Sequence, residues 1–218
     1  MILIRKSREP SSLTQYRKQP HASYDGYKEK ADLREALLRD QGYLCAYCMR
    51  RIENQRESMK IEHWKAQSQL TSEAEKLDFR IMLAVCDGCR GDQDRYTTCD
   101  EHRHNKELFV NPMDPSMMET IEYSRNGYIK SSDPRIDRDL NLILNLNCEQ
   151  SKSRIVLNRK NVYSECVSRL AKRKPSGQWT TEFLQSVLED LTKTTDGRLQ
   201  PFIGVIKYVI VKHMRKCK

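Results

Sequence analysis

Glu62 and His63 are neighbours in a basic stretch, residues 60–68, and their side chains could do acid–base chemistry beside a metal ion. Imidazole titrates near neutral pH, and carboxylates are preferred ligands of hard divalent cations. We therefore interpret the stretch as an active-site strand. A structural interpretation also fits, in which His63 is a buried histidine that is hydrogen-bonded beneath Trp64.

Cysteines frame this stretch on both sides. Cys45 and Cys48 have the two-residue gap that lets both sulfurs of a tight turn reach one zinc ion. Such a pair could also be a redox site, but no strand–helix–strand pattern surrounds it. Zinc takes four ligands and three cysteines follow downstream. The spacing of Cys86 and Cys89 favours Cys89 as the fourth ligand, whereas a predicted helix start at Cys99 favours Cys99.

Composition limits the functional classes. The chain has 218 residues, 32% of them charged, and its formal net charge of +9 favours phosphate-rich partners such as nucleic acid. A basic protein that binds no nucleic acid would have the same balance. We find neither a signal-peptide pattern nor an apolar run of membrane-spanning length, so we expect a cytoplasmic protein. Its eight cysteines are then better explained as metal ligands and ordinary residues than as a disulfide framework.

The elements that must position the acid and the histidine are short. We predict an extended arm over residues 1–30, a helix over 28–41 that ends at Gly42, and a strand over 61–64. Alternation along a strand points neighbouring side chains to opposite faces, so Glu62 and His63 share one site only if the strand ends or bends there. The apolar run at residues 79–85 should be buried beside the metal.

A short helix should carry a second acid. Thr98 followed by Glu101 is a capping box, which predicts a helix that begins at Cys99. Asp100 would then lie in the first turn and share a face with His104, four residues on. Asp100 could equally serve only to complement the helix dipole.

The remainder of the chain predicts a β-hairpin followed by helices. The hairpin spans residues 119–132 and turns at 125–127. Helical patterns cover residues 139–145, 151–172, 180–191 and 200–215. The last helix is apolar around more than one narrow stripe, so we expect part of it to pack against a partner. Basic clusters at residues 169–174 and 207–218 are either solvated helix faces or a surface that tracks phosphates.

The ordered motifs resemble a known family. Cys45-x-x-Cys48, Glu62-His63, Cys86 and Cys99-Asp100 are similar to the HNH endonucleases with a ββα-metal site. Further segments look like the PtuB nucleases of Septu and some retron anti-phage systems, namely residues 41–48, 61–64, 82–88, 98–100, 111–112, 144–147 and the last helix. The resemblance covers most of the chain, although only the core motifs are specific.

The resemblance implies a fold and three parts. The fold would be α+β and mainly helical, with a small zinc-stapled ββα-metal HNH core, a β-hairpin and a helical C-terminal region. Residues 1–44 would be an N-terminal arm and helix, and residues 45–112 the nuclease core. Residues 113–218 would be the hairpin and helical region that docks a partner.

The resemblance also implies an activity and its residues. The protein would be a metal-dependent nuclease that hydrolyses phosphodiester bonds in DNA or structured RNA. His63 would be the general base, while Glu62 and Asp100 would hold one Mg²⁺ ion, for which Mn²⁺ could substitute. His102 and His104 are second-rank catalytic candidates. A structural zinc ion would be held by Cys45, Cys48, Cys86 and Cys99, with Cys89 as the alternative fourth ligand.

The implied setting is an anti-phage defence complex with a PtuA-like ATPase, which retron RNA and DNA and a reverse transcriptase could join. One departure bears on activity. HNH proteins carry a central Asn just before the apolar run into the third cysteine, and Ile81 stands there instead. Its loss would lower activity without removing the base or the metal ligands. Two other interpretations remain, a catalytically weak or inactive zinc-stapled adaptor and a zinc-ribbon transcription or translation factor.

Overall fold

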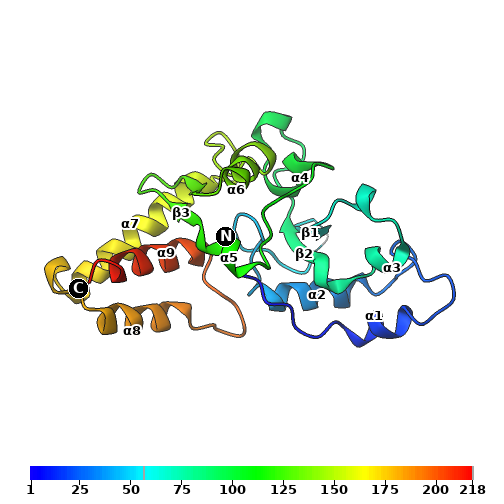
Figure 1. The fold of residues 1–218 in the computed structure, drawn as a ribbon, viewed down its shortest axis with the longest axis horizontal. Helices are drawn as coiled ribbons and strands as arrows, with labels where there is room; N and C mark the ends of the chain where they lie inside the picture. The colour runs from blue at the N-terminus through cyan, green and yellow to red at the C-terminus, as the bar shows by residue number, and fades with distance from the viewer. Residues whose placement is uncertain (56, 218) are drawn as a thin grey trace.

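The computed structural model describes residues 1–55 and 57–217 and has an α+β fold. Its strands form two separate two-stranded sheets, and helices supply most of the remaining regular structure. Figure 1 shows the N-terminal helices α1 and α2 beside the sheet β1–β2 at one end of the molecule. Helices α7, α8 and α9 extend to the other end. The predicted fold class is therefore confirmed at this coarse level.

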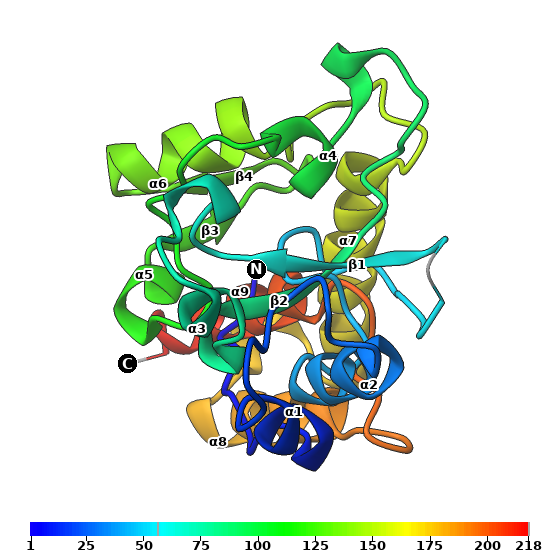
Figure 2. The same ribbon diagram turned by 90° about the vertical axis from the view of Figure 1, so that its right-hand side faces the viewer.

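The first sheet and the helix that follows it form the ββα unit of the molecule. Strand β1 (Met59–His63) pairs antiparallel with β2 (Met82–Cys86), with Met59 opposite Cys86 and His63 opposite Met82. All five residues of β2 are buried. Helix α4 (Cys99–Arg103) packs against β2. Figure 2 shows the two strands side by side, with α4 above them. The expected strand thus starts two residues earlier than residue 61 and ends at His63.

The N-terminal region contains three helices, α1 (Ser11–Tyr16), α2 (Lys30–Asp40) and α3 (Glu73–Lys76), the last of them between the two strands of the sheet. The extended arm expected over residues 1–30 is partly wrong, because α1 forms there and buries Leu13 completely. Helix α2 follows the sequence pattern and ends next to Gly42, whose φ is +59°. The buried Gln41 side chain then exchanges two hydrogen bonds with the backbone of Ala84, at 2.7 and 2.8 Å, and so attaches α2 to β2.

The C-terminal half begins with the predicted hairpin. Its regular elements are α5 (Pro115–Glu119), β3 (Ile121–Tyr123), β4 (Ile129–Ser131), α6 (Pro134–Arg138), one turn of π-helix (Asp139–Ile143), α7 (Ile155–Arg173), α8 (Thr181–Thr192) and α9 (Ile203–Met214). The turn glycine, Gly127, has a φ of +86° and lies against the backbone of Val156 in α7. Side chains have no room there, which explains why this turn needs a glycine.

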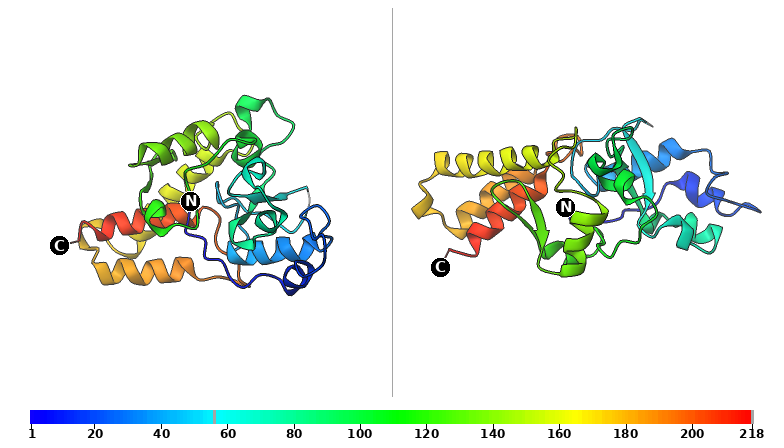
Figure 3. Two further views of the ribbon diagram at one scale, coloured as in Figure 1. Left: turned by 45° about the vertical axis from the view of Figure 1, so that its right-hand side comes forward. Right: turned by 90° about the horizontal axis from the view of Figure 1, so that it is seen from above.

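Helix α9 lies at the centre of the C-terminal half, as the view from above in Figure 3 makes clear. It contacts α7, α8 and β3, and its residues Ile203, Val205, Val209 and Ile210 are fully buried. These elements of the same chain cover most of its apolar surface, and the expectation that part of the helix packs against a partner stays a prediction. A sequence pattern does not distinguish cover by the same chain from cover by a partner.

None of the helices in the described part of the chain is both long enough and apolar enough to cross a membrane.

Candidate metal centre and acidic site

Four cysteine side chains converge behind the β1–β2 sheet. The sulfurs of Cys45, Cys48, Cys86 and Cys99 lie within 4.8 Å of one another, and all four residues are buried. The Cys45–Cys99 and Cys48–Cys86 sulfur pairs are 3.9 and 3.8 Å apart. A tetrahedron with zinc–sulfur bonds of about 2.3 Å has edges of about 3.8 Å, so this cluster has the dimensions of a four-thiolate zinc site.

Each ligand comes from a different kind of local structure. Cys45 and Cys48 belong to a tight knuckle in which the Met49 N–H donates to the Cys45 carbonyl at 3.0 Å. Cys86 ends β2, and its N–H donates to the Cys45 sulfur at 3.3 Å. Cys99 is the first residue of α4. A metal ion bound here would therefore fasten the knuckle, the sheet and α4 to one another.

The electrostatics of the cluster suit a cation. Burial raises the pKa of the Cys45 thiol, but hydrogen bonds from the other three thiols outweigh it and hold that pKa well below its usual value, whereas the neighbouring thiols raise the pKa values of Cys48 and Cys99. A thiolate is the form in which cysteine binds metal. The donor set is soft and closed, so it fits a structural zinc ion that keeps no open position for chemistry.

Cys89, the alternative fourth ligand, lies outside the cluster. Its sulfur is 3.4 Å from the hydroxyl of Ser151, and its φ is +64°. The chain turns sharply at Gly88 and Cys89, so Cys89 points away from Cys86 despite their favourable spacing. The structure thus brings Cys99 to the other three cysteines, as the helix-start argument predicted.

The two acids predicted to hold a second metal ion lie next to each other. Glu62 on β1 points towards α4, where Asp100 lies in the first turn. Burial and the neighbouring Asp100 carboxylate raise the pKa of Glu62 to about 9, although Arg103 acts in the opposite direction. A pair of carboxyl groups that repel each other in this way is a natural place for a cation.

Two basic residues already contact these acids. The Lys60 amino group lies 3.0 Å from the Asp100 carboxylate and 2.6 Å from that of Glu101. The Arg103 guanidinium, only 1% exposed, pairs with Glu62 and also donates to the carbonyls of His63 and Trp64 at 2.9 and 2.8 Å. Arg103 therefore fixes the end of β1 to α4.

His63 faces away from the acids. Its ring is 2% exposed, and it lies edge-on against Tyr24, with the ring centres 4.8 Å apart. Nε2 is 2.8 Å from the Lys76 carbonyl, which can only accept, so Nε2 must carry the hydrogen. Nδ1 then has a lone pair and accepts from the Gln67 amide at 3.0 Å. Burial lowers the pKa of His63, so the ring is neutral near pH 7.

The second-rank histidines lie on another surface. Nδ1 of His102 is 3.0 Å from the Asp94 carbonyl, and Nε2 of His104 is 2.9 Å from the Asp94 carboxylate. His104 is the residue after α4 and has a φ of +52°. The expectation that it shares a helix face with Asp100 is therefore wrong. The structure does not bring either histidine to Glu62.

Three features of this site differ from, or are absent from, what the sequence pattern predicts. The capping box is wrong, because the Thr98 side chain makes no cap bond and the Glu101 carboxylate contacts Lys60 instead. Arg103 looked like one of many basic residues, and only its burial sets it apart. The bond from Gln67 to His63 spans four residues along an irregular segment, where no periodic pattern exists to detect it.

Comparison of the chain with protein-family models and with curated proteins gave no match.

Proposed function

We propose that the protein is a metal-dependent nuclease of the HNH type, which hydrolyses phosphodiester bonds in DNA or structured RNA. The observation that carries the proposal is the meeting of Glu62 and Asp100 beside the four-cysteine cluster, at the junction of β1, β2 and α4. The order of the elements also supports it. Strand β1 carries an acid and a histidine, β2 follows, and α4 carries a second acid. The net charge of +9 suits a polyanionic substrate.

In this proposal the two acids hold a divalent cation, Mg²⁺ or Mn²⁺, through oxygen ligands. When bound, such an ion would neutralise negative charge that develops on the scissile phosphate and its leaving oxygen. Lys60 donates to the Asp100 carboxylate at 3.0 Å and so helps to orient it. The soft four-cysteine cluster would hold zinc and carry no chemistry.

His63 would act as the general base once its ring, which faces away from the acids here, turns towards them. Its low pKa keeps the ring neutral, and its tautomer leaves the lone pair on Nδ1, the atom that must accept the proton of the attacking water. The Gln67 amide now occupies this lone pair, so it must move aside when substrate binds. The Lys76 carbonyl, which accepts from Nε2, would stabilise the imidazolium that forms.

We further propose that the nuclease is the effector of an anti-phage complex with an ATPase of the PtuA type. This part rests only on the sequence resemblance to PtuB. Co-expression with an ATPase of the PtuA type, followed by co-purification, would test it. An ATPase that fails to co-purify would contradict this part and leave the nuclease proposal standing.

Cleavage by a His63→Ala variant tests the nuclease proposal. Loss of the general base should slow Mg²⁺-dependent cleavage of DNA or RNA by about 10²- to 10⁴-fold. Zinc content and the far-ultraviolet circular dichroism spectrum should not change. The matched control is His102→Ala, which removes a histidine outside the acidic site and should keep full activity. Cleavage by His63→Ala at the wild-type rate would refute the role of this residue.

One observation favours a second candidate function, a non-catalytic zinc-stapled adaptor. Glu62 is already paired with Arg103, and both ring nitrogens of His63 are hydrogen-bonded. An adaptor would show no Mg²⁺-dependent cleavage in the purified complex. It would also keep its defence phenotype in a Glu62→Gln variant, which a nuclease would lose.

A further inference from the structure

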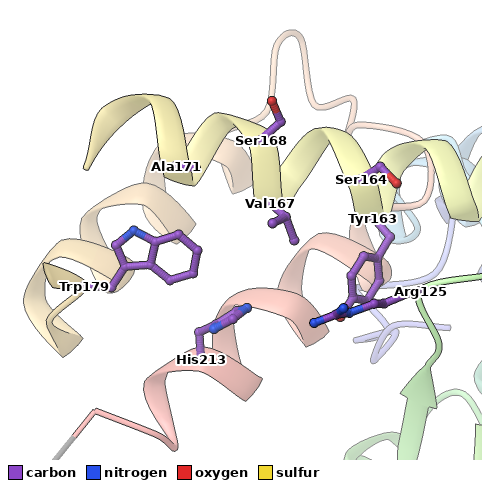
Figure 4. Close-up of a pocket in the computed structure, with 8 residues that line it drawn as sticks. All are labelled: Arg125, Tyr163, Ser164, Val167, Ser168, Ala171, Trp179 and His213. Atoms are coloured by element: carbon purple, nitrogen blue, oxygen red, sulfur yellow. The ribbon is translucent and has the colours of Figure 1, made fainter. Parts of the chain in front are cut away.

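A groove opens at the far end of the molecule from the ββα unit. It has a volume of about 560 Å³ and lies between α7 and α9, next to the β3–β4 turn. Figure 4 shows Val167 and Ser168 on its α7 wall, with Trp179 and His213 at one end and Tyr163 and Arg125 at the other. This volume is within the range of small-molecule and single-nucleotide pockets.

Aromatic rings form the ends of this α7–α9 groove. The Trp179 ring meets that of His213 edge-on at 4.7 Å, and its Nε1 donates to the Lys174 carbonyl at 2.7 Å. These contacts hold the indole in place. Tyr163 is buried and supplies the floor at the opposite end. The groove therefore offers fixed aromatic surfaces of the kind on which a planar ring can stack.

The rim of the groove is basic. Lys160, Ser164, Ser168 and Lys172 follow one another at intervals of four residues along α7, so the two exposed lysines flank the serines of the groove wall. Arg125 enters from the β3–β4 turn. No acidic residue is among the lining residues of the groove in the described chain.

These cations differ from other basic residues of the same region. Arg169 and Arg173, which belong to the basic cluster seen in the sequence, pair with Glu165 and Asp190. Within residues 1–55 and 57–217, no such ion pair engages Arg125, Lys160 or Lys172. Only part of the predicted basic surface is therefore available to phosphate groups.

We propose that the α7–α9 groove binds an unpaired base of single-stranded nucleic acid, with the neighbouring phosphates on its basic rim. The base would stack on the Trp179 indole, with Tyr163 as the apolar floor at the other end of the groove. Arg125, Lys160 and Lys172 would contact the phosphates on either side. A double helix keeps its bases stacked inside and cannot place one in the groove without distortion. This site is independent of cleavage chemistry and would hold for either candidate function.

His213 reports on the charge in the groove. Burial lowers its pKa, and the nearby Lys216, Lys212 and Arg125 lower it further. The Trp179 indole packs edge-on against the ring, the Cys217 thiol contacts the Trp179 and His213 carbonyls, and the charges that act on the ring are these three cations. A phosphate that enters the groove should therefore raise the pKa of His213.

Binding of a short fluorescent oligodeoxythymidylate, measured by anisotropy in Mg²⁺-free buffer, tests the proposal. Trp179→Ala should weaken the affinity for the single strand at least about fivefold, because base stacking on one aromatic ring has that value or more. Ser168→Glu should weaken the affinity for the single strand by a similar factor, because its negative charge repels the phosphates. The position is exposed and tolerates the change. Ser168→Gln is the size-matched control and should bind as the wild type does.

Further arms identify the ligand. A duplex of the same length should be unaffected by Trp179→Ala, and nuclear magnetic resonance should show the pKa of His213 rising when the single strand binds. Equal binding of single strand and duplex, or wild-type affinity in both Trp179→Ala and Ser168→Glu, would overturn the proposal. So would an acidic peptide that occupies the groove when the single strand does not. Absence of nuclease activity would not, since binding is measured without cleavage.

Discussion

Arg103 shows how much of the candidate site depends on one side chain. It joins α4 to β1 by pairing with Glu62 and donating to the carbonyls of His63 and Trp64, and its Nε donates to the Lys106 carbonyl at 2.8 Å. The guanidinium is planar and carries several fixed donors, which allows one group to satisfy four acceptors. Lysine has a single ammonium group and cannot reproduce this arrangement.

We predict that Arg103→Lys lowers the free energy of unfolding by about 3 kcal/mol, because it leaves the Glu62 carboxyl group and the backbone carbonyls without full hydrogen-bond partners. Urea unfolding measures the effect. The control is Arg169→Lys, which keeps the positive charge of an exposed ion pair with Glu165. The free energy of unfolding should change by no more than about 0.5 kcal/mol. An Arg103→Lys variant as stable as the wild type would show that the guanidinium contacts contribute little.

His213 predicts a pH dependence. Its pKa is lower in the folded state than its ordinary value of 6.5, since burial and three neighbouring cations oppose protonation. Between these two values the unfolded chain binds a proton that the folded chain does not, so stability should fall as the pH drops below about 6.5. His213→Gln should remove this contribution. Thermal unfolding between pH 5 and 8 should then show a flatter profile for His213→Gln than for the wild type, and parallel profiles would contradict the assignment.

At the scale of elements, periodic patterns were informative and irregular segments were not. Helix α8 and the β3–β4 hairpin lie within a residue or two of their predicted positions, because a regular apolar period and an Asn-Gly turn each indicate one structure. Helix α1 was missed because a single buried side chain, Leu13, fixes it. Residue spacing could not identify the fourth cysteine of the cluster. The backbone turn at Cys89, with its positive φ, is set by the surrounding loop and leaves no periodic pattern in the sequence.

The four-cysteine cluster gives a prediction for the elements that it connects. If the cluster holds about one zinc ion per chain, Cys99→Ser should lower that zinc content. It should also lower the melting temperature, because α4 would no longer be attached to the knuckle and β2. Cys89→Ser removes a thiol outside the cluster and should keep the zinc. Zinc analysis by plasma mass spectrometry measures both. Loss of zinc in Cys89→Ser with retention in Cys99→Ser would reverse the ligand assignment.

On the scale of the whole molecule, the C-terminal segment returns to the knuckle. The Leu199 N–H donates to the Gly42 carbonyl at 3.1 Å, and the Phe202 N–H donates to the Met49 carbonyl at 3.0 Å. Gly204 allows α9 to approach closely, since a Cβ atom there would lie 2.7 Å from the Met49 sulfur. The knuckle that carries two of the clustered cysteines thus rests on the helix that forms the core of the other half.

These contacts predict that both halves unfold together. The chain has two tryptophans. The Trp64 indole N–H donates a hydrogen bond to the Val110 carbonyl beside the candidate site, and Trp179 lies in the α7–α9 groove. Single-tryptophan variants, Trp64→Phe and Trp179→Phe, should each show one urea transition by fluorescence that coincides with the transition seen by circular dichroism of the same variant.

A zinc chelator sharpens this test. Because α9 rests on the knuckle, removal of zinc should lower the urea midpoint reported by Trp179 as well as the one reported by Trp64. The Trp64→Phe variant isolates the Trp179 signal, so the shift can be measured at the end of the molecule farther from the cysteines. If the chelator moved only the Trp64 signal, the helical half would be shown to fold independently of the four-cysteine cluster, and the contacts of Leu199 and Phe202 would not couple the two.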